Sequence, residues 1–125
     1  MKRVVVTGMS CITALGDDWP SLRSALEKGD NAVKVMEQWQ DVADLNTKLA
    51  APVTHFQRPS HYKRKMVRSM GRVALMATVA TERALAQSGL LEHPALTNGD
   101  TGIAYGSSTG STPPLIAFAD MMKSG

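Results

Sequence analysis

The sequence has little of what marks a secreted, metal-binding or membrane protein. Its 125 residues include one cysteine, which excludes an internal disulfide. The histidines His55, His61 and His93 are scattered, without metal-ligand spacing to one another or to Cys11, so we expect no metal site. No hydrophobic run approaches the length of a membrane span, and three valines after Arg3 are too few for a signal peptide. We expect a cytoplasmic protein with no membrane contact.

Acidic residues are also missing from one long interval. None lies between Asp44 and Glu82, although the net charge is only +3. The interval contains seven basic residues: Lys48, Arg58, Lys63, Arg64, Lys65, Arg68 and Arg72. Aromatic side chains that could stack on bases are absent there apart from Tyr62, which disfavours nucleic acid as the partner. The cluster therefore favours an acidic protein partner, and the alternative is a plain solvated surface.

What is present is a globular composition, with 43% hydrophobic residues, enough for one core. Residues 3–7 form a β-branched run ended by Gly8, which predicts a buried strand. Residues 17–18 can cap a short helix that stops at Gly29. Residues 30–59 show weak periodicity, with a possible edge strand over 49–53.

The second half predicts a long helix, a strand and another helix. Apolar and small residues recur at helical spacing from Arg64 to Ser88, with Gly89 as the stop. On one helix, Arg64, Arg68 and Arg72 would form a stripe. Its like charges would repel one another and oppose the helix dipole at the N-terminus, which an acidic partner would explain. A turn over 97–100 then precedes a strand over 102–105, and residues 113–114 open a helix. The predicted order is β-α-(loop)-α-β-α.

Three kinds of chemistry find only weak support. A nucleotide-binding loop needs glycines where Ile12 and Ala14 stand. Ser108 lies in a literal G-x-S-x-G pattern, which would make it the nucleophile of a serine hydrolase, but no histidine follows it. Cys11 has no base nearby in the sequence and is better interpreted as a small buried residue than as a nucleophile.

Several motifs, taken in order, resemble one family. Residues 4–8 read Val-Val-Val-Thr-Gly and residues 13–16 read Thr-Ala-Leu-Gly. Residues 65–68 read Lys-Met-Val-Arg and open an alanine-rich segment that ends in Gln-Ser-Gly-Leu, and residues 102–107 enter a Gly-Ser turn. This order resembles the start of a β-ketoacyl-acyl carrier protein synthase of the ketosynthase II type, with departures at Ala14, Val67 and Ser69.

The resemblance implies an α/β, thiolase-like layered fold, of which residues 1–125 would be an incomplete N-terminal portion covering most of the first half. It also implies an acyltransferase that performs a decarboxylative Claisen condensation. The acyl chain would arrive on the phosphopantetheine arm of a carrier protein, with no bound cofactor. The family's catalytic cysteine and histidines would lie beyond Gly125, so we expect the chain alone to be inactive. An unfinished sheet would expose strand edges and apolar helix faces, so we also expect the chain alone to fold poorly.

Two sets of site residues follow from the same resemblance. Thr109 matches a position that lines the acyl pocket in the family. Arg64 and Lys65 match the basic residues that dock the acyl carrier protein, and Lys63 and Arg68 lie beside them.

The resemblance leaves the biological setting open. It implies a homodimer or a ketosynthase heterodimer, working in fatty-acid, polyketide or aryl-polyene biosynthesis. A non-catalytic partner subunit, similar to a chain-length factor, is the alternative because such proteins share the fold without the nucleophile.

Overall fold

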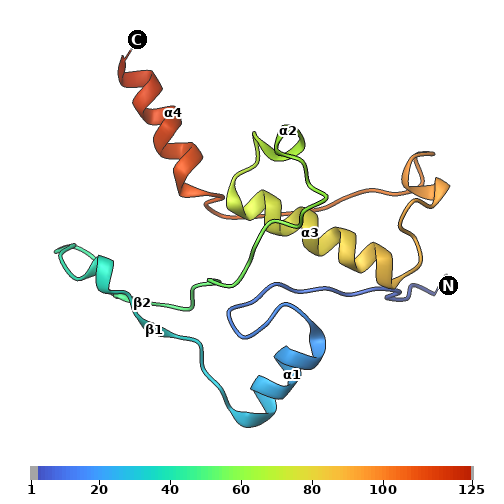
Figure 1. Ribbon diagram of the computed structural model, residues 1–125, viewed down its shortest axis with the longest axis horizontal. Helices are drawn as coiled ribbons and strands as arrows, with labels where there is room; N and C mark the ends of the chain where they lie inside the picture. Colours follow the sequence, from blue (N-terminus) through green and yellow to red (C-terminus); the bar gives the residue numbers. More distant parts are fainter. Residues whose placement is uncertain (1–2, 125) are drawn as a thin grey trace. The chain divides into compact units, whose positions relative to one another are not determined.

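The computed structural model describes residues 3–124, and this part of the chain forms two compact units. One unit contains the residues up to Met9 and those from Arg58 onward, and the other is Ser10–Gln57. The elements are α1 (Trp19–Lys28), β1 (Lys34–Val35), η1 (Glu37–Trp39), β2 (Leu49–Ala50), α2 (Arg64–Val67), α3 (Arg72–Gln87), η2 (Pro94–Leu96) and α4 (Thr112–Ser124) (Figure 1).

In the unit over residues 10–57, the two helix caps predicted around α1 are confirmed. Asp18 is the N-cap, and its side chain accepts a hydrogen bond from the backbone N–H of Ser21 at 2.7 Å. Gly29 ends the helix with a φ of 73°, which glycine adopts without steric cost. The predicted edge strand is confirmed over Leu49–Ala50, which pairs antiparallel with Lys34–Val35.

In the other unit, the single long helix predicted from Arg64 to Ser88 is wrong. The structure has a one-turn helix, α2, and a separate 16-residue helix, α3, that begins at Arg72. Gly71 is the N-cap of α3 and has extended backbone angles, so the helical path is interrupted there. The end of α3 agrees with the prediction, since Gly89 follows its C-cap with a φ of 72°.

The interruption has a cause that lies far away in the sequence. The Oγ of Ser111 accepts a hydrogen bond from the backbone N–H of Val73 at 2.9 Å, which satisfies one free donor at the start of α3. A Cβ on Gly71 would lie 2.6 Å from both the Cβ and the Oγ of Ser111. The two segments can therefore approach this closely only because residue 71 has no side chain.

α3 is the best packed helix of its unit. Val79, at its centre, is 1% exposed. Near the end of the helix, the backbone N–H of Met9 donates to Oε1 of Gln87 at 2.5 Å. A Cβ on Gly8 would lie 2.2 Å from the backbone oxygen of Ala84, so glycine is needed for this approach as well.

The two strands predicted over 3–7 and 102–105 are not formed. Neither segment belongs to a strand among residues 3–124, and the side chains of Val4, Val6 and Ile103 are 92%, 78% and 79% exposed. A buried strand needs neighbours for its backbone hydrogen bonds and cover for its side chains. The part of the chain that the structure describes supplies neither to these segments.

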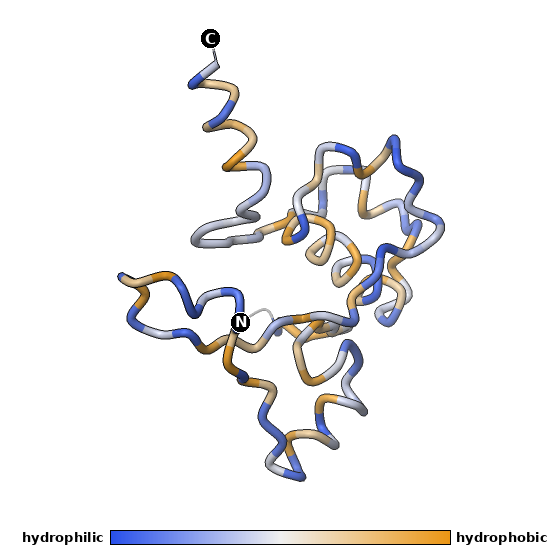
Figure 2. Tube along the Cα trace, turned by 60° about the vertical axis from the view of Figure 1, so that its left-hand side comes forward, coloured by the Kyte–Doolittle hydropathy of each residue, from blue (hydrophilic) through white to orange (hydrophobic). Residues whose placement is uncertain are grey.

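α4 confirms the predicted helix after residues 113–114, and it too is exposed. It leads away from α3 within its unit (Figure 1), and hydrophobic residues recur along its length (Figure 2). The larger ones, Leu115, Ile116, Phe118, Met121 and Met122, are 55 to 66% exposed. Among the described residues, no helix combines the length and apolarity needed to cross a membrane.

The contact between Gly71 and Ser111 can be tested with a double-mutant cycle in the full-length protein. We expect Gly71→Ala to lower the free energy of unfolding by about 2 kcal/mol, because the new methyl group overpacks the contact. In a Ser111→Gly background the same change should cost less than about half as much, since the clashing atoms are gone. Urea unfolding curves provide the measurement, and equal costs in both backgrounds would contradict the contact.

Candidate functional site

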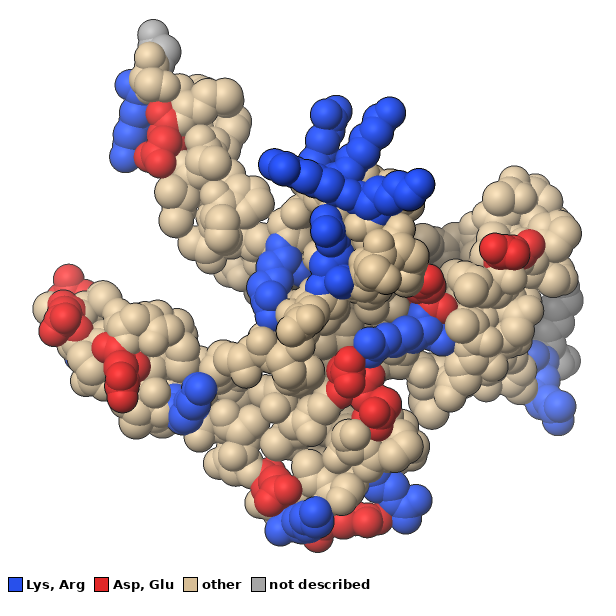
Figure 3. All heavy atoms as spheres, viewed as in Figure 1, with Lys and Arg blue, Asp and Glu red and all other residues tan. Residues whose placement is uncertain are grey.

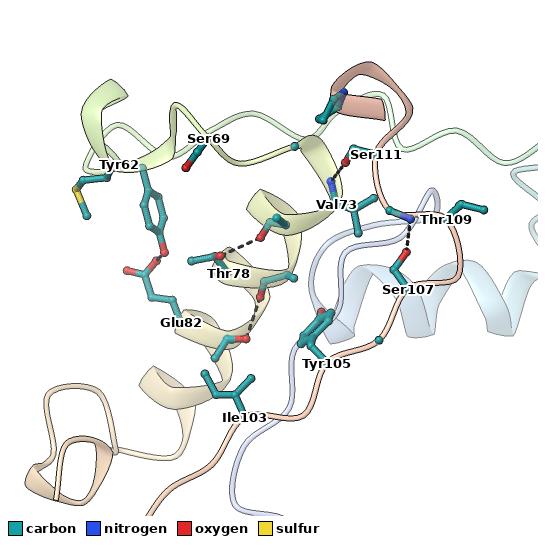
Figure 4. A pocket seen from close by; sticks show the side chains of 18 of the residues that line it. Tyr62, Ser69, Val73, Thr78, Glu82, Ile103, Tyr105, Ser107, Thr109 and Ser111 are labelled. Atoms are coloured by element: carbon teal, nitrogen blue, oxygen red, sulfur yellow. Dashed lines mark hydrogen bonds between the residues drawn. The ribbon is translucent and has the colours of Figure 1, made fainter. Parts of the chain in front are cut away.

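The unit that contains α3 has a cavity of about 930 Å³. Its wall is formed by the segment around α2, by one face of α3, by residues 103–111 and by the start of α4 (Figure 4). Most of the lining is apolar, with Met66, Val73, Leu85, Leu91, Ile103 and Leu115 among its members. A cavity of this size and character suits a largely hydrophobic ligand.

A short turn closes one side of the cavity. The Oγ of Ser107 accepts a hydrogen bond from the backbone N–H of Gly110 at 2.9 Å, and Gly110 has a φ of 64°. One residue later, Ser111 caps α3. The turn over 107–110 is therefore fixed internally and is tied to the helix that forms the opposite wall.

Thr109 lies in this turn and lines the cavity (Figure 4). Its side chain is exposed in this part of the chain. The location is compatible with the predicted contact with an acyl chain, which stays a prediction.

Three side chains meet at the other end of the cavity. The hydroxyl of Tyr62 donates to Oε2 of Glu82 at 2.5 Å, and Nε2 of His61 lies 2.9 Å from Oε1 of the same carboxylate. Tyr62 is buried, with 8% exposed, whereas the His61 side chain is 58% exposed. Figure 4 shows the tyrosine ring standing over α3 with its hydroxyl at the carboxylate of Glu82.

The pKa values of this group report the same hydrogen bonds. The hydrogen bond from Tyr62 lowers the pKa of Glu82, more than desolvation raises it, and His61 adds to the lowering. Burial, followed by the interaction with Glu82, raises the pKa of Tyr62 to about 12. At neutral pH the pair is therefore a neutral phenol donating to an ionised carboxylate, which is a strong charge-assisted hydrogen bond.

The predicted docking residues, Lys63, Arg64, Lys65 and Arg68, lie immediately after Tyr62; we call them the basic cluster. Lys63 is the N-cap of α2, Arg64 and Lys65 are in its single turn, and Arg68 is its C-cap. All four are exposed. Figure 3 shows blue side chains spreading from this region into solvent. The structure brings these residues together, while their role in docking stays a prediction.

The predicted arginine stripe is wrong in its geometry. Arg64 and Arg68 belong to α2 and its C-cap, but Arg72 is the first residue of α3, beyond the interruption at Gly71. The three residues therefore do not share one helix face. A four-residue helix also has too few aligned peptide units for its dipole to oppose the cations, so that part of the sequence argument fails too.

The other residues weighed from the sequence do not form a catalytic group. Cys11 is a half-buried free thiol. Within residues 3–124, no group of three or more histidine, cysteine and acidic side chains could hold a metal ion. Ser107 and Thr109 line the cavity, but Ser108, the serine of the hydrolase interpretation, does not.

Sequence reasoning missed the group formed by His61, Tyr62 and Glu82. Their side chains meet across 20 or 21 residues of sequence. The available signal was Glu82 itself, the acidic residue that ends the acid-free interval and lies on the helix that follows the basic cluster.

Comparison with known proteins agrees with this architecture. The family model for "Beta-ketoacyl synthase, N-terminal domain" matches residues 1–124. A crystal structure of a beta-ketoacyl synthase from Burkholderia phymatum superposes with a TM-score of 0.89 at 47% sequence identity, covering 100% of this chain and 31% of that one. The thiolase-like fold is thus shown.

Curated relatives carry related names. The "3-oxoacyl-[acyl-carrier-protein] synthase 1" of Haemophilus influenzae is 27% identical over 98% of this chain and 30% of its own length. The synthase 1 of Escherichia coli K12 is 25% identical over the same shares. The chloroplastic synthase II of Arabidopsis thaliana is 29% identical over 73% of this chain and 17% of its own length.

These matches decide between the interpretations left open by the sequence. The chain spans about 30% of the length of the first curated relatives. A single family model nevertheless accounts for nearly every residue, including the segments considered for nucleotide binding and for a serine hydrolase. The chain belongs to the beta-ketoacyl synthase family, whose N-terminal domain it matches.

Proposed function

We propose that the protein containing this chain is a 3-oxoacyl-acyl carrier protein synthase. The observation that carries the proposal is the match of the family's N-terminal domain to residues 1–124, together with the 47% identical solved synthase. The relatives named above are synthases of this kind.

The proposed reaction is a decarboxylative condensation. An acyl group passes from the phosphopantetheine thiol of a carrier protein to a cysteine thiolate of the enzyme. A malonyl thioester then loses carbon dioxide, and the carbanion that remains attacks the acyl thioester carbon. The new carbon–carbon bond gives a 3-oxoacyl carrier thioester and frees the cysteine. We assign no catalytic role to Cys11 or to the three histidines of this chain.

Within that reaction we assign two tasks to this chain. The basic cluster offers four exposed cations to an acidic carrier protein. The cavity beside α3 offers an apolar wall to the acyl chain, with Thr109 in the turn that closes one side. The chain also has exposed apolar surface, including Val4 and the α4 face. This surface supports assembly with further sheets and helices of the full protein or with a second subunit.

The reaction itself can be tested with the full-length protein. We expect purified protein, given an acyl carrier thioester and malonyl carrier protein, to release carbon dioxide and form a lengthened 3-oxoacyl carrier thioester detectable by mass spectrometry. A protein that binds the carrier but forms no product, either by itself or with a non-catalytic partner subunit, would contradict the enzymatic assignment. Such a protein that restores activity to a separate ketosynthase would instead be a non-catalytic subunit.

The docking assignment predicts a charge-reversal effect. Arg64→Glu combined with Lys65→Glu should weaken carrier binding about tenfold and flatten its dependence on salt, because the attraction between opposite charges is lost. Lys28→Glu combined with Lys34→Glu changes the net charge equally at exposed positions outside the basic cluster. Fluorescence anisotropy of labelled carrier protein gives both affinities, and equal losses in the two variants would contradict local docking.

The pocket assignment predicts a change in chain-length preference. Thr109→Phe should shift the accepted acyl chains toward shorter ones, because a ring would fill part of the apolar cavity. Thr109→Ser keeps a small hydroxyl side chain and should leave the product distribution unchanged. Product profiles from a mixture of acyl donors are the measurement, and a wild-type profile from Thr109→Phe would remove Thr109 from the pocket.

A further inference from the structure

Glu82 connects α3 to the segment that leads directly into the basic cluster. Its carboxylate accepts the Tyr62 hydroxyl at 2.5 Å and lies 2.9 Å from Nε2 of His61. Lys63, the first member of the cluster, is the next residue after Tyr62 and the N-cap of α2. The hydrogen bond is therefore made one residue before the surface that we propose for docking.

α2 has few other means of holding its position. It is four residues long, and Val67 is its buried residue, with 8% exposed. A single helical turn is not stable without tertiary contacts. Tyr62, which is buried to the same extent, supplies a second anchor at the entry to the turn. Because a buried hydroxyl needs a partner, this anchor depends on the carboxylate of Glu82.

We propose that Glu82 is a positioning residue for carrier-protein docking, which it serves by fixing Tyr62 and thereby the place and direction of the basic cluster. The proposal rests on the proposed function, because it concerns the same docking surface. Glu82 is not assigned any contact with the carrier protein or with the reacting atoms.

The sign of one substitution separates this role from simple electrostatics. Glu82 carries a negative charge behind a surface that is proposed to attract an acidic protein. If charge alone mattered, removing that charge would strengthen carrier binding. If Glu82 positions the cluster, removing it should weaken binding, because the cations then spend less time in the arrangement that fits the partner.

The experiment compares three variants of the full-length protein. Glu82→Leu removes both hydrogen bonds and the charge, Glu82→Gln keeps an acceptor without the charge, and Tyr62→Phe removes only the hydroxyl. Asp120→Asn, at an exposed residue of α4, is the control for net charge. Affinity for carrier protein is measured by anisotropy, and steady-state kinetics are measured with malonyl carrier protein and with malonyl coenzyme A.

We expect Glu82→Leu to weaken carrier affinity about five- to tenfold and Tyr62→Phe about threefold, with Glu82→Gln between wild type and Glu82→Leu. KM for malonyl carrier protein should rise by the same factors, with a smaller change in kcat. Kinetics with malonyl coenzyme A, which has no carrier protein to dock, should change much less than those with malonyl carrier protein. A small change is expected because Tyr62 and Glu82 also line one end of the cavity. The Asp120→Asn control should match wild type throughout.

The outcomes distinguish this inference from the function on which it rests. If charge reversal at Arg64 and Lys65 leaves carrier binding unchanged, the docking surface itself is wrong. If charge reversal weakens binding while Glu82→Leu and Tyr62→Phe leave it unchanged or strengthen it, docking stands and the positioning role of Glu82 is overturned. Equal losses with malonyl coenzyme A and with malonyl carrier protein would also overturn it, because the effect would then be on the fold rather than on docking.

Discussion

The close approach of Gly71 and Ser111 organises the unit around α3. A hydroxyl from a distant segment caps the helix through Val73, and the absence of a side chain at residue 71 makes room for it. This contact caps the start of α3 and ties the segment that follows Thr109 to that helix. The cavity and the basic cluster lie on either side of the same junction, so both candidate sites depend on one backbone arrangement.

The units are held mainly by local contacts, and much apolar surface is left over. Val79 is the most deeply buried side chain of the described residues, whereas Val4, Ile103 and Phe118 are largely exposed. In the matches that cover nearly all of this sequence, it aligns to 30 or 31% of the relative's own length. The exposed valines and isoleucine lie in the two segments that the sequence predicts as strands. A β-branched composition of this kind is expected where neighbouring strands pair with a segment and cover its side chains.

Local signals in the sequence predicted local structure well. Asp18 and Gly29 mark the ends of α1, and Gly89 marks the end of α3, because caps act within a few residues. Features that depend on distant residues were missed. The interruption at Gly71 requires Ser111, which no periodicity reveals, and the predicted strands require neighbours that the described residues do not supply. The family itself was predictable because its motifs keep their order along the chain.

The same division applies to the candidate sites. Charge distribution located the basic cluster, since a run of cations without acids is visible in any sequence. The hydrogen bond between Tyr62 and Glu82 joins residues 20 positions apart, and no sequence pattern predicts it.

One consequence of the shortness of α2 is evolutionary. A single turn with one buried valine can exchange its outward residues at little cost to folding, so the charges of the basic cluster can change without disturbing α3 or the cavity.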